Sequence, residues 1–367
     1  MNLDFSDEQK AAREEIRRLL TGYPGLASTR RALNGQERLD RGLWSQLGRG
    51  GWLGVTIPGA FGGQSLGYEM LCCVAEEVGR SMAAIPFGAS VVLVTDALLQ
   101  GGSEAQRQAY LPALACGELI GAAALVDGRG TLRAAAHGCL FEAGRLTGTR
   151  SAVSDGLDAN LFVVLAHAAG EPGLYLVEGS DRHVLRQPQQ GIDPAHTPVR
   201  VRFEGAAAQA LPGCAGWSNI EAWLARAAVV VAFEQLGAAG AALDAAIAYA
   251  KERHAFGRPI GSFQAIKHKL ADVYIANELA RSNAYYGAWA LESGASTLAL
   301  AAAAARVSAT EALERAAREC IQTHGGIAVT WEHDAHLFYR RAQHFALMLG
   351  GLREWQFRLV QELARTA

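Results

Sequence analysis

The pattern of apolar and polar positions along the chain changes from helical to strand-like and back again. Residues 6–20 place apolar side chains at helical intervals among Arg and Glu, and Ser6 and Gln9 have the spacing of a capping box. The same periodicity predicts further helices over residues 68–78, which Gly79 would end as a C-cap, 89–100 and 104–115. Residues up to about 115 therefore form a predicted helical domain.

The next hundred residues are rich in Gly, Val and Thr and show short alternating runs. These runs predict strands over residues 138–142, 161–165, 173–177 and 198–204. Short strands at near-regular spacing with turn signals between them favour a small β-barrel or sandwich.

From Asn219 onward the chain is rich in Ala and Leu. Four long helical runs are predicted over residues 220–253, 263–293, 298–323 and 333–364. Apolar residues lie on most faces of these runs, so the helices must pack against one another, and a four-helix bundle is the natural solution. The predicted fold is mostly α with a central β-domain: an N-terminal helical domain over 1–117, a β-barrel over 118–215 and a C-terminal bundle over 216–367.

Composition and charge exclude several classes of partner. The 367 residues carry 34 basic and 36 acidic side chains without a block of like charge, which argues against nucleic acid or an anionic membrane as partner. The six cysteines are scattered, with no CxxC pair, and this favours small buried thiols in a reducing cytoplasm. Neither export nor a membrane span is expected, because the chain opens with Asp4, Asp7 and Glu8 and not with a positive region before an apolar core, and charges or glycines break the later apolar runs.

The stretch Arg253–Gln264 is the most informative motif. It is a basic turn with Gly and Pro between two long helical runs, and such a junction is suited to binding another group. Taken alone, the simpler interpretation is that Arg253 is a charge that complements a helix C-terminus and that Gly325–Gly326 is a turn.

The order of domains, together with several motifs, resembles the acyl-CoA dehydrogenase family over the whole chain. The motifs are Gly51–Gly54 with Pro58–Gly63, Glu76–Arg80, Tyr110–Pro112 with Gly117, Arg253–Gln264 running on to Leu270–Asp272, and Gln322–Ile327. The resemblance implies an FAD enzyme that oxidises an acyl-CoA thioester. It also implies a dimer or tetramer of this chain, or of this chain with another subunit of the family, because members build the FAD site across a subunit interface.

The resemblance assigns cofactor roles residue by residue. Arg253 matches the arginine that meets the FAD pyrophosphate, and its planar fork of donors suits two adjacent phosphates. Phe256 and Gln264 match positions that pack against and hydrogen-bond the nucleotide. The remaining predicted FAD contacts are Gln322, Gly325 and Gly326, where backbone approaches the cofactor closely.

The catalytic base of the family is missing. The family reaction removes an α-proton with a positioned carboxylate while the β-hydrogen leaves as hydride to the flavin. The usual base position, ten residues after the Tyr339–Ala342 motif, is Leu349, and the alternative position on the first bundle helix is Ala227. Glu234, two turns further along that helix, is the best remaining carboxylate, although a structural role is the simpler interpretation; Glu354 is a weaker candidate.

The part of the site that would hold the acyl group and the flavin ring also departs from the family pattern. The substrate-contacting arginine expected near Ala228 is absent, with Arg226 two residues early, and Leu125–Gly128 and Ser151–Gly156 replace the usual flavin-facing segments. Some family enzymes that act on bulky steroid or polyketide-like acyl-CoAs combine two different subunits, one of which lacks the base. We therefore expect this chain to be such a non-basic subunit of an FAD-dependent enzyme of lipid or steroid catabolism.

Two alternatives stay open. One is a self-sufficient flavoenzyme that uses an unconventional base such as Glu234, and the other is a catalytically silent homologue without flavin. No metal site is expected, because the cluster His333, Asp334 and His336 matches a family cluster that packs the C-terminal helices.

Overall fold

The computed structural model describes residues 5–23, 25–127 and 132–366. Their packing divides the chain into two compact units: residues 1–37, 68–83 and 228–367, and residues 38–67 and 84–227. The predicted three-domain division stays a prediction. The long helix α8, Trp217–Glu252, begins in the second unit and continues in the first.

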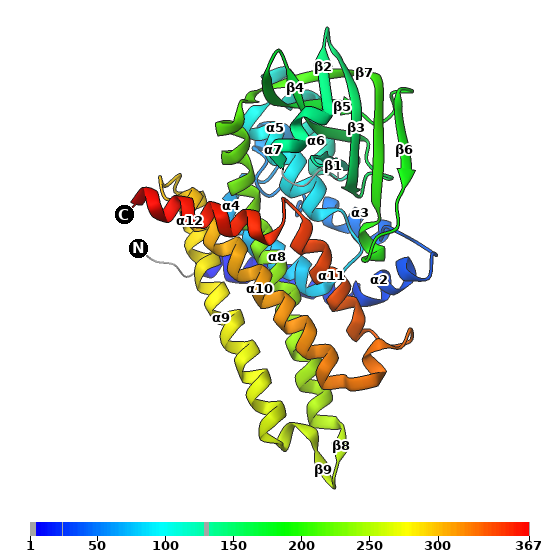
Figure 1. Cartoon of the computed structure of the whole chain (residues 1–367), viewed down its shortest axis with the longest axis vertical. Coiled ribbons are helices and arrows are strands. Elements are labelled where there is room, and N and C mark those ends of the chain that lie inside the picture. Colours follow the sequence, from blue (N-terminus) through cyan, green and yellow to red (C-terminus); the bar gives the residue numbers. More distant parts are fainter. Residues whose placement is uncertain (1–4, 24, 128–131, 367) are drawn as a thin grey trace. The chain divides into compact units, whose positions relative to one another are not determined.

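The first unit is helical. Its N-terminal helices are α1 (Asp7–Thr21), α2 (Gly25–Leu33) and α4 (Gly67–Ser81). After α8 come α9 (Gln264–Glu292), α10 (Leu298–His324), α11 (Ala335–Leu347) and α12 (Leu352–Thr366), and α10 packs against α9, α11 and α12 (Figure 1). The capping box at the start of α1 is confirmed: the Gln9 N–H donates to Ser6 Oγ at 3.2 Å, and the Ser6 N–H donates to Gln9 Oε1 at 2.7 Å.

The second unit combines short helices with seven strands. Its helices are α3 (Arg41–Arg49), the π-helix η2 (Phe87–Val94), α5 (Thr95–Gly101), α6 (Glu104–Ala115) and α7 (Leu132–Ala135), with the 3₁₀ turns η1 (Gly59–Phe61), η3 (Ala136–Gly138) and η4 (Pro194–His196). Its strands are β1 (Gly121–Ala124), β2 (Cys139–Glu142), β3 (Arg145–Ser154), β4 (Leu161–Ala168), β5 (Glu171–Glu178), β6 (Val184–Pro188) and β7 (Pro198–Ala215).

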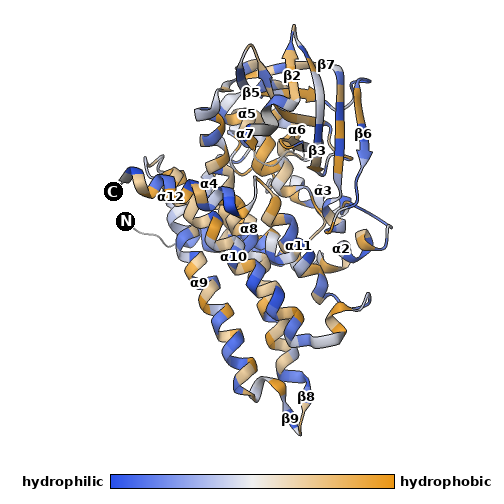
Figure 2. Ribbon diagram, viewed as in Figure 1, coloured by the Kyte–Doolittle hydropathy of each residue, from blue (hydrophilic) through white to orange (hydrophobic). Residues whose placement is uncertain are grey.

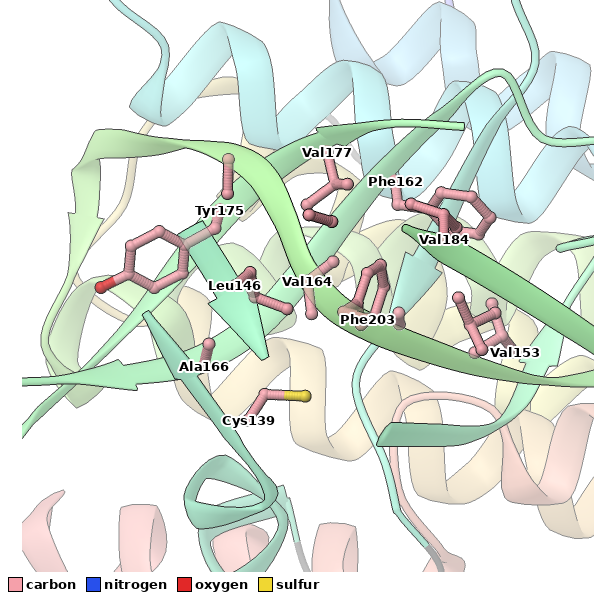
Figure 3. Close-up of a cluster of buried hydrophobic side chains, with 14 of the residues drawn as sticks. Cys139, Leu146, Val153, Phe162, Val164, Ala166, Tyr175, Val177, Val184 and Phe203 are labelled. Carbon is pink, nitrogen blue, oxygen red and sulfur yellow. The ribbon is translucent and has the colours of Figure 1, made fainter. Parts of the chain in front are cut away.

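The strands form the small barrel that the sequence predicts. They pair in the order β1-β4-β2-β3-β7-β5, and an additional β4–β5 pairing closes the ring, while β6 pairs with β7. Alternation along β7 buries Val199, Val201 and Phe203 and exposes the residues between them, and Figure 2 shows blue and orange segments alternating along this strand. The barrel interior is filled by apolar side chains from facing strands, among them Leu146, Val164, Val177 and Phe203 in Figure 3.

Two boundaries in the first unit differ from the prediction. Gly79 is not a C-cap, because α4 continues to Ser81. The fourth helical run is interrupted, and it forms α11 and α12 with a break at residues 348–351. At that break Leu349 has φ 63° and Gly350 has φ 95°, so two successive residues in the left-handed region stop the helix.

Gly79 has a packing role instead of a capping role. A Cβ at Gly79 would lie 1.9 Å from the Glu234 carbonyl oxygen, and a Cβ at Gly237 would lie 1.9 Å from the Glu76 carbonyl oxygen. Helices α4 and α8 therefore meet backbone to backbone at a reciprocal pair of glycines. This contact brings the carboxylates of α4 into the unit interior, where Glu76 and Glu77 pair with Arg13, Arg17 and Arg281.

We expect Gly79→Ala to lower the free energy of unfolding by about 3 kcal/mol, because backbone atoms of α8 cannot move aside as a flexible side chain would. Gly59→Ala is the matched control, since a Cβ there would approach other atoms no closer than 4.0 Å. Urea unfolding of both variants measures the difference. Equal midpoints for the two variants would refute the close crossing.

Among the described helices, α8 is the one that is long and apolar enough to cross a membrane by composition. In the structure 72% of its most apolar window is buried, as in the core helix of a folded domain. This burial accounts for the apolar character of α8 through packing within the protein.

Candidate functional site

The basic stretch that the sequence singles out is a small hairpin at one end of the first unit (Figure 1). Strands β8 (His254–Ala255) and β9 (Arg258–Pro259) pair with each other, and the 3₁₀ turn η5 (Ile260–Ser262) leads into α9. The two turn residues, Phe256 and Gly257, both have positive φ, as a tight hairpin turn requires. The left-handed conformation is unfavourable for Phe256 by about 1 kcal/mol. Burial of the side chain does not offset this cost, because Phe256 is 95% exposed.

The polar side chains predicted to hold a nucleotide are exposed and available. Within the described part of the chain, the side chains of Arg253, Gln264 and Gln322 form no hydrogen bond or ion pair. The backbone of Arg253 is nevertheless fixed, because its N–H donates to the Tyr249 carbonyl at 2.8 Å and its carbonyl accepts from the Ile260 N–H at 2.8 Å. A held backbone with a free guanidinium suits an anionic ligand such as a pyrophosphate.

The second predicted contact segment follows helix α10. Gly325 begins the 3₁₀ turn η6 (Gly325–Val329) with φ 68° and ψ −145°, a backbone conformation open to glycine alone. A Cβ at Gly325 or Gly326 would meet no atom within 4 Å, so the surface over this backbone is open. A ring contact between Tyr249 and His324 joins this segment to helix α8, which Arg253 directly follows. The structure thus places all six predicted FAD contacts at one end of the first unit.

Exposed apolar side chains surround this end. Ile327, Val329 and Trp331 alternate along the segment after Gly326, and Val329 is 70% exposed. Phe256 in the hairpin is exposed as well. Large apolar side chains exposed in this way are typical of a protein–protein contact.

The usual base position lies at the break between α11 and α12. Leu349 is buried, and its carbonyl accepts a hydrogen bond from Trp355 Nε1 at 3.1 Å. Arg306 of α10 donates to the Met348 carbonyl at 2.6 Å and to the Phe345 carbonyl. The break is therefore held on both sides of Leu349, and the side chain it presents is apolar.

The other candidates for proton transfer have structural partners or no polar group. Ala227 is a buried methyl on α8. Glu234 is 5% exposed. Burial lowers the pKa of Arg306, the charge of Glu234 acts in the opposite direction, and the resulting pKa is about 9. Glu354 accepts from Arg358 Nη2 at 2.9 Å and lies over Gly350, where a Cβ would be 2.7 Å from its Oε2.

The residues that the sequence assigns to the substrate half have partners within the chain. Arg226 donates to both carboxylate oxygens of Asp96 at 3.2–3.4 Å, so its charge is neutralised within the second unit. Strand β3 has an irregular register between Arg150 and Val153, and the Ala152 N–H donates to Gln189 Oε1 at 2.9 Å. In the segment Leu125–Gly128, residue 128 lies outside the described residues.

The histidine-rich segment before α11 forms hydrogen bonds to arginines. Asp334 accepts from Arg30 Nε at 2.9 Å, and His336 Nδ1 accepts from Arg340 Nε at 3.1 Å. The described part of the chain contains no group of three or more His, Cys, Asp or Glu side chains placed to hold a metal ion.

Sequence reasoning overlooked Tyr249, His324, Arg306 and Trp355. No signal in the sequence separates Arg306 from the other arginines of the Ala-rich run 298–323, since Arg315 and Arg318 of the same run are exposed. The contact between Tyr249 and His324 joins residues 75 positions apart, and neither periodicity nor a motif reports it.

Comparisons with known proteins match most of the chain. Residues 6–118 match the family model described as acyl-CoA dehydrogenase, N-terminal domain, and residues 215–364 match that described as acyl-CoA dehydrogenase, C-terminal domain. The acyl-CoA dehydrogenase IpdE2 of Mycobacterium tuberculosis is 31% identical over 97% of this chain and 98% of its own length.

Two similar solved structures are each named for a pair of chains. One is a variant of the Tcur3481–Tcur3483 steroid ACAD, with a TM-score of 0.89, 30% identity and 98% coverage of both chains. The other is the ChsE4–ChsE5 complex from Mycobacterium tuberculosis, with a TM-score of 0.90, 27% identity and 100% coverage of both chains.

Proposed function

The chain belongs to the acyl-CoA dehydrogenase family, and from that premise we propose that it is the non-basic subunit of a heteromeric, FAD-dependent acyl-CoA dehydrogenase. The proposed reaction is the α,β-dehydrogenation of a bulky acyl-CoA in lipid or steroid catabolism. The observation that carries this proposal is a contrast within the chain. The nucleotide-binding side chains are exposed and available, whereas Leu349 and Ala227 fill both base positions.

The residues at the hairpin and after α10 fit the nucleotide half of FAD. Arg253 would donate two parallel hydrogen bonds to phosphate oxygens, and Gln264 and Gln322 would hydrogen-bond polar atoms of the nucleotide. Gly325 and Gly326 allow the ligand to approach the backbone closely. When bound, FAD supplies the hydride acceptor of the dehydrogenation.

This chain's own residues do not supply proton abstraction at the family positions. Leu349 and Ala227 have no titratable atom, and the charge of Glu234 stabilises Arg306 in the interior of the first unit. We infer that the carboxylate base comes from a second, basic subunit of the same family. The exposed apolar side chains of Phe256, Ile327, Val329 and Trp331 support contact with such a subunit.

The solved relatives support the same arrangement. The Tcur3481–Tcur3483 and ChsE4–ChsE5 structures are named for two different chains, and the first is named a steroid ACAD. Acyl-CoA as substrate follows from the family, and a steroid-type acyl group is the class that we propose. Cytoplasmic location is part of the proposal as well, and the six free cysteines are compatible with a reducing compartment.

The visible spectrum of the purified protein tests the proposal. We expect the chain to be colourless when it is purified alone, and yellow and active on acyl-CoA when it is co-expressed with a basic family subunit encoded near it. A yellow, active preparation of the chain alone would contradict the partner-subunit proposal and favour a self-sufficient enzyme. A chain that stays colourless with every candidate subunit would favour a silent homologue.

A further inference from the structure

The two segments that would hold the FAD nucleotide follow different helices. Arg253 follows α8, whereas Gly325 and Gly326 follow α10. One ligand can contact both segments only if the ends of these two helices keep a fixed distance and orientation. Among the described residues, His324 contacts two rings at this point: it stacks on Tyr249 of α8, and it makes a tilted contact with His333 at a centroid distance of 4.8 Å.

The contact with α8 is the stack of Tyr249 on His324. The ring centroids are 4.3 Å apart, and the ring planes are inclined by 29°. Tyr249 lies one helical turn before Arg253, and the hydrogen bond from the Arg253 N–H to the Tyr249 carbonyl closes that turn. His324 directly precedes Gly325. The stack therefore connects the last turn before Arg253 to the residue before Gly325.

The imidazole of His324 is held in one orientation. Its Nδ1 lies 2.7 Å from the Cys320 carbonyl oxygen, and because a carbonyl only accepts hydrogen bonds, Nδ1 carries the proton. Burial lowers the pKa of His324, with the backbone bond to Cys320 acting against this and the neighbouring His333 acting with it. The ring is thus neutral near pH 7 and stacks as a flat, largely buried surface.

We propose that His324, through its stack on Tyr249, is a positioning residue that holds the Gly325–Gly326 backbone in register with Arg253 for binding one FAD nucleotide. This inference rests on the proposed function, because it requires that the site binds FAD. Neither His324 nor Tyr249 is among the predicted FAD contacts, so both would act through the residues next to them in the chain.

Paired substitutions of similar volume separate the stack from simple burial. His324→Leu and Tyr249→Leu keep apolar bulk but remove the flat ring, whereas His324→Phe and Tyr249→Phe keep a ring that can stack. The affinity for FAD is measured by titrating deflavinated protein with FAD, in the preparation that carries flavin as purified. Thermal unfolding of each variant shows whether the fold is kept.

We expect each Leu variant to bind FAD about tenfold more weakly and each Phe variant to recover most of that affinity, as the energy of an aromatic pair implies. The double Leu variant should bind no more weakly than either single variant, because both lose the same contact. A control far from the stack, His183→Ala in the second unit, should leave FAD affinity unchanged.

The outcomes distinguish this inference from the proposed function. If the wild-type protein binds FAD and all four variants bind it equally well, the positioning role is wrong and the proposed function stands. Additive losses in the double Leu variant also overturn the inference, because they show that the two rings act independently. If the wild-type protein binds no FAD in any preparation, both the inference and the proposed function fail.

Discussion

Arg253→Ala is expected to release FAD from the assembled enzyme, with affinity reduced by about 100- to 10,000-fold. The guanidinium is exposed, and within the described chain it has no ion-pair partner, so its donors are available for phosphate oxygens. Charge-assisted hydrogen bonds each contribute about 1.5–3 kcal/mol, and the substitution removes both bonds of a bidentate contact. The ratio of flavin to protein after gel filtration, followed by an FAD titration, measures the loss.

Two further variants make this test specific. Arg258→Ala removes an equal charge five residues away, where the guanidinium lies 4.0 Å over the Phe263 ring, and it should retain FAD. Arg253→Lys keeps the charge but loses the planar fork, so its affinity should fall between those of Arg253→Ala and the wild type. Unchanged flavin content in Arg253→Ala would remove this residue from the site.

Arg306→Met is expected to destabilise the first unit by about 3–5 kcal/mol, because three acceptors lose a charged donor and each buried group left unsatisfied costs about 1–3 kcal/mol. Arg306 is fully buried, and it donates to the Gln235 side chain and to the carbonyls of Phe345 and Met348. Methionine fills the space but leaves these acceptors without their donor and Glu234 without this cation. Urea unfolding of the purified chain gives the change in the free energy of unfolding.

A double-mutant cycle with Glu234→Gln tests the pairing of Glu234 with Arg306. If the carboxylate is the countercharge of Arg306, the double variant should be more stable than the sum of the single losses predicts. Strict additivity would show that the two residues act separately. The same Glu234→Gln protein should keep full activity in an active preparation, and a large loss of activity with normal folding would instead restore Glu234 as a candidate base.

Several features of this protein depend on residue identity and short-range periodicity, and the sequence predicts these correctly. The capping box of Ser6 and Gln9 involves residues three positions apart, so the pattern alone reports it. Alternation in the run 198–204 predicts a strand, although β7 continues to Ala215 because its later residues pair with β5. The mostly helical fold with a small barrel is confirmed in the same way.

The break between α11 and α12 shows where the pattern stops being sufficient. The helical periodicity of residues 333–364 continues through Leu349, and Gly350 and Gly351 mark only a weak point. The break is fixed by distant groups: Arg306 binds the carbonyls before it, and Trp355 binds the carbonyl of Leu349. Likewise Gly79 has the spacing of a C-cap, but its role depends on the α8 backbone beside it.

By itself the sequence determined which chemistry this chain can contribute. It supplies a basic hairpin and a Gly-Gly segment that resemble a nucleotide site, and it supplies Leu349 and Ala227 where a base would stand, because a side chain's functional groups are fixed by its identity. Only the tertiary structure decided which of these groups are available. Glu234 is buried and its charge acts on Arg306, whereas Arg253 is exposed and forms no ion pair within the described chain. The stack of Tyr249 on His324 brings two helix ends together across 75 residues of chain.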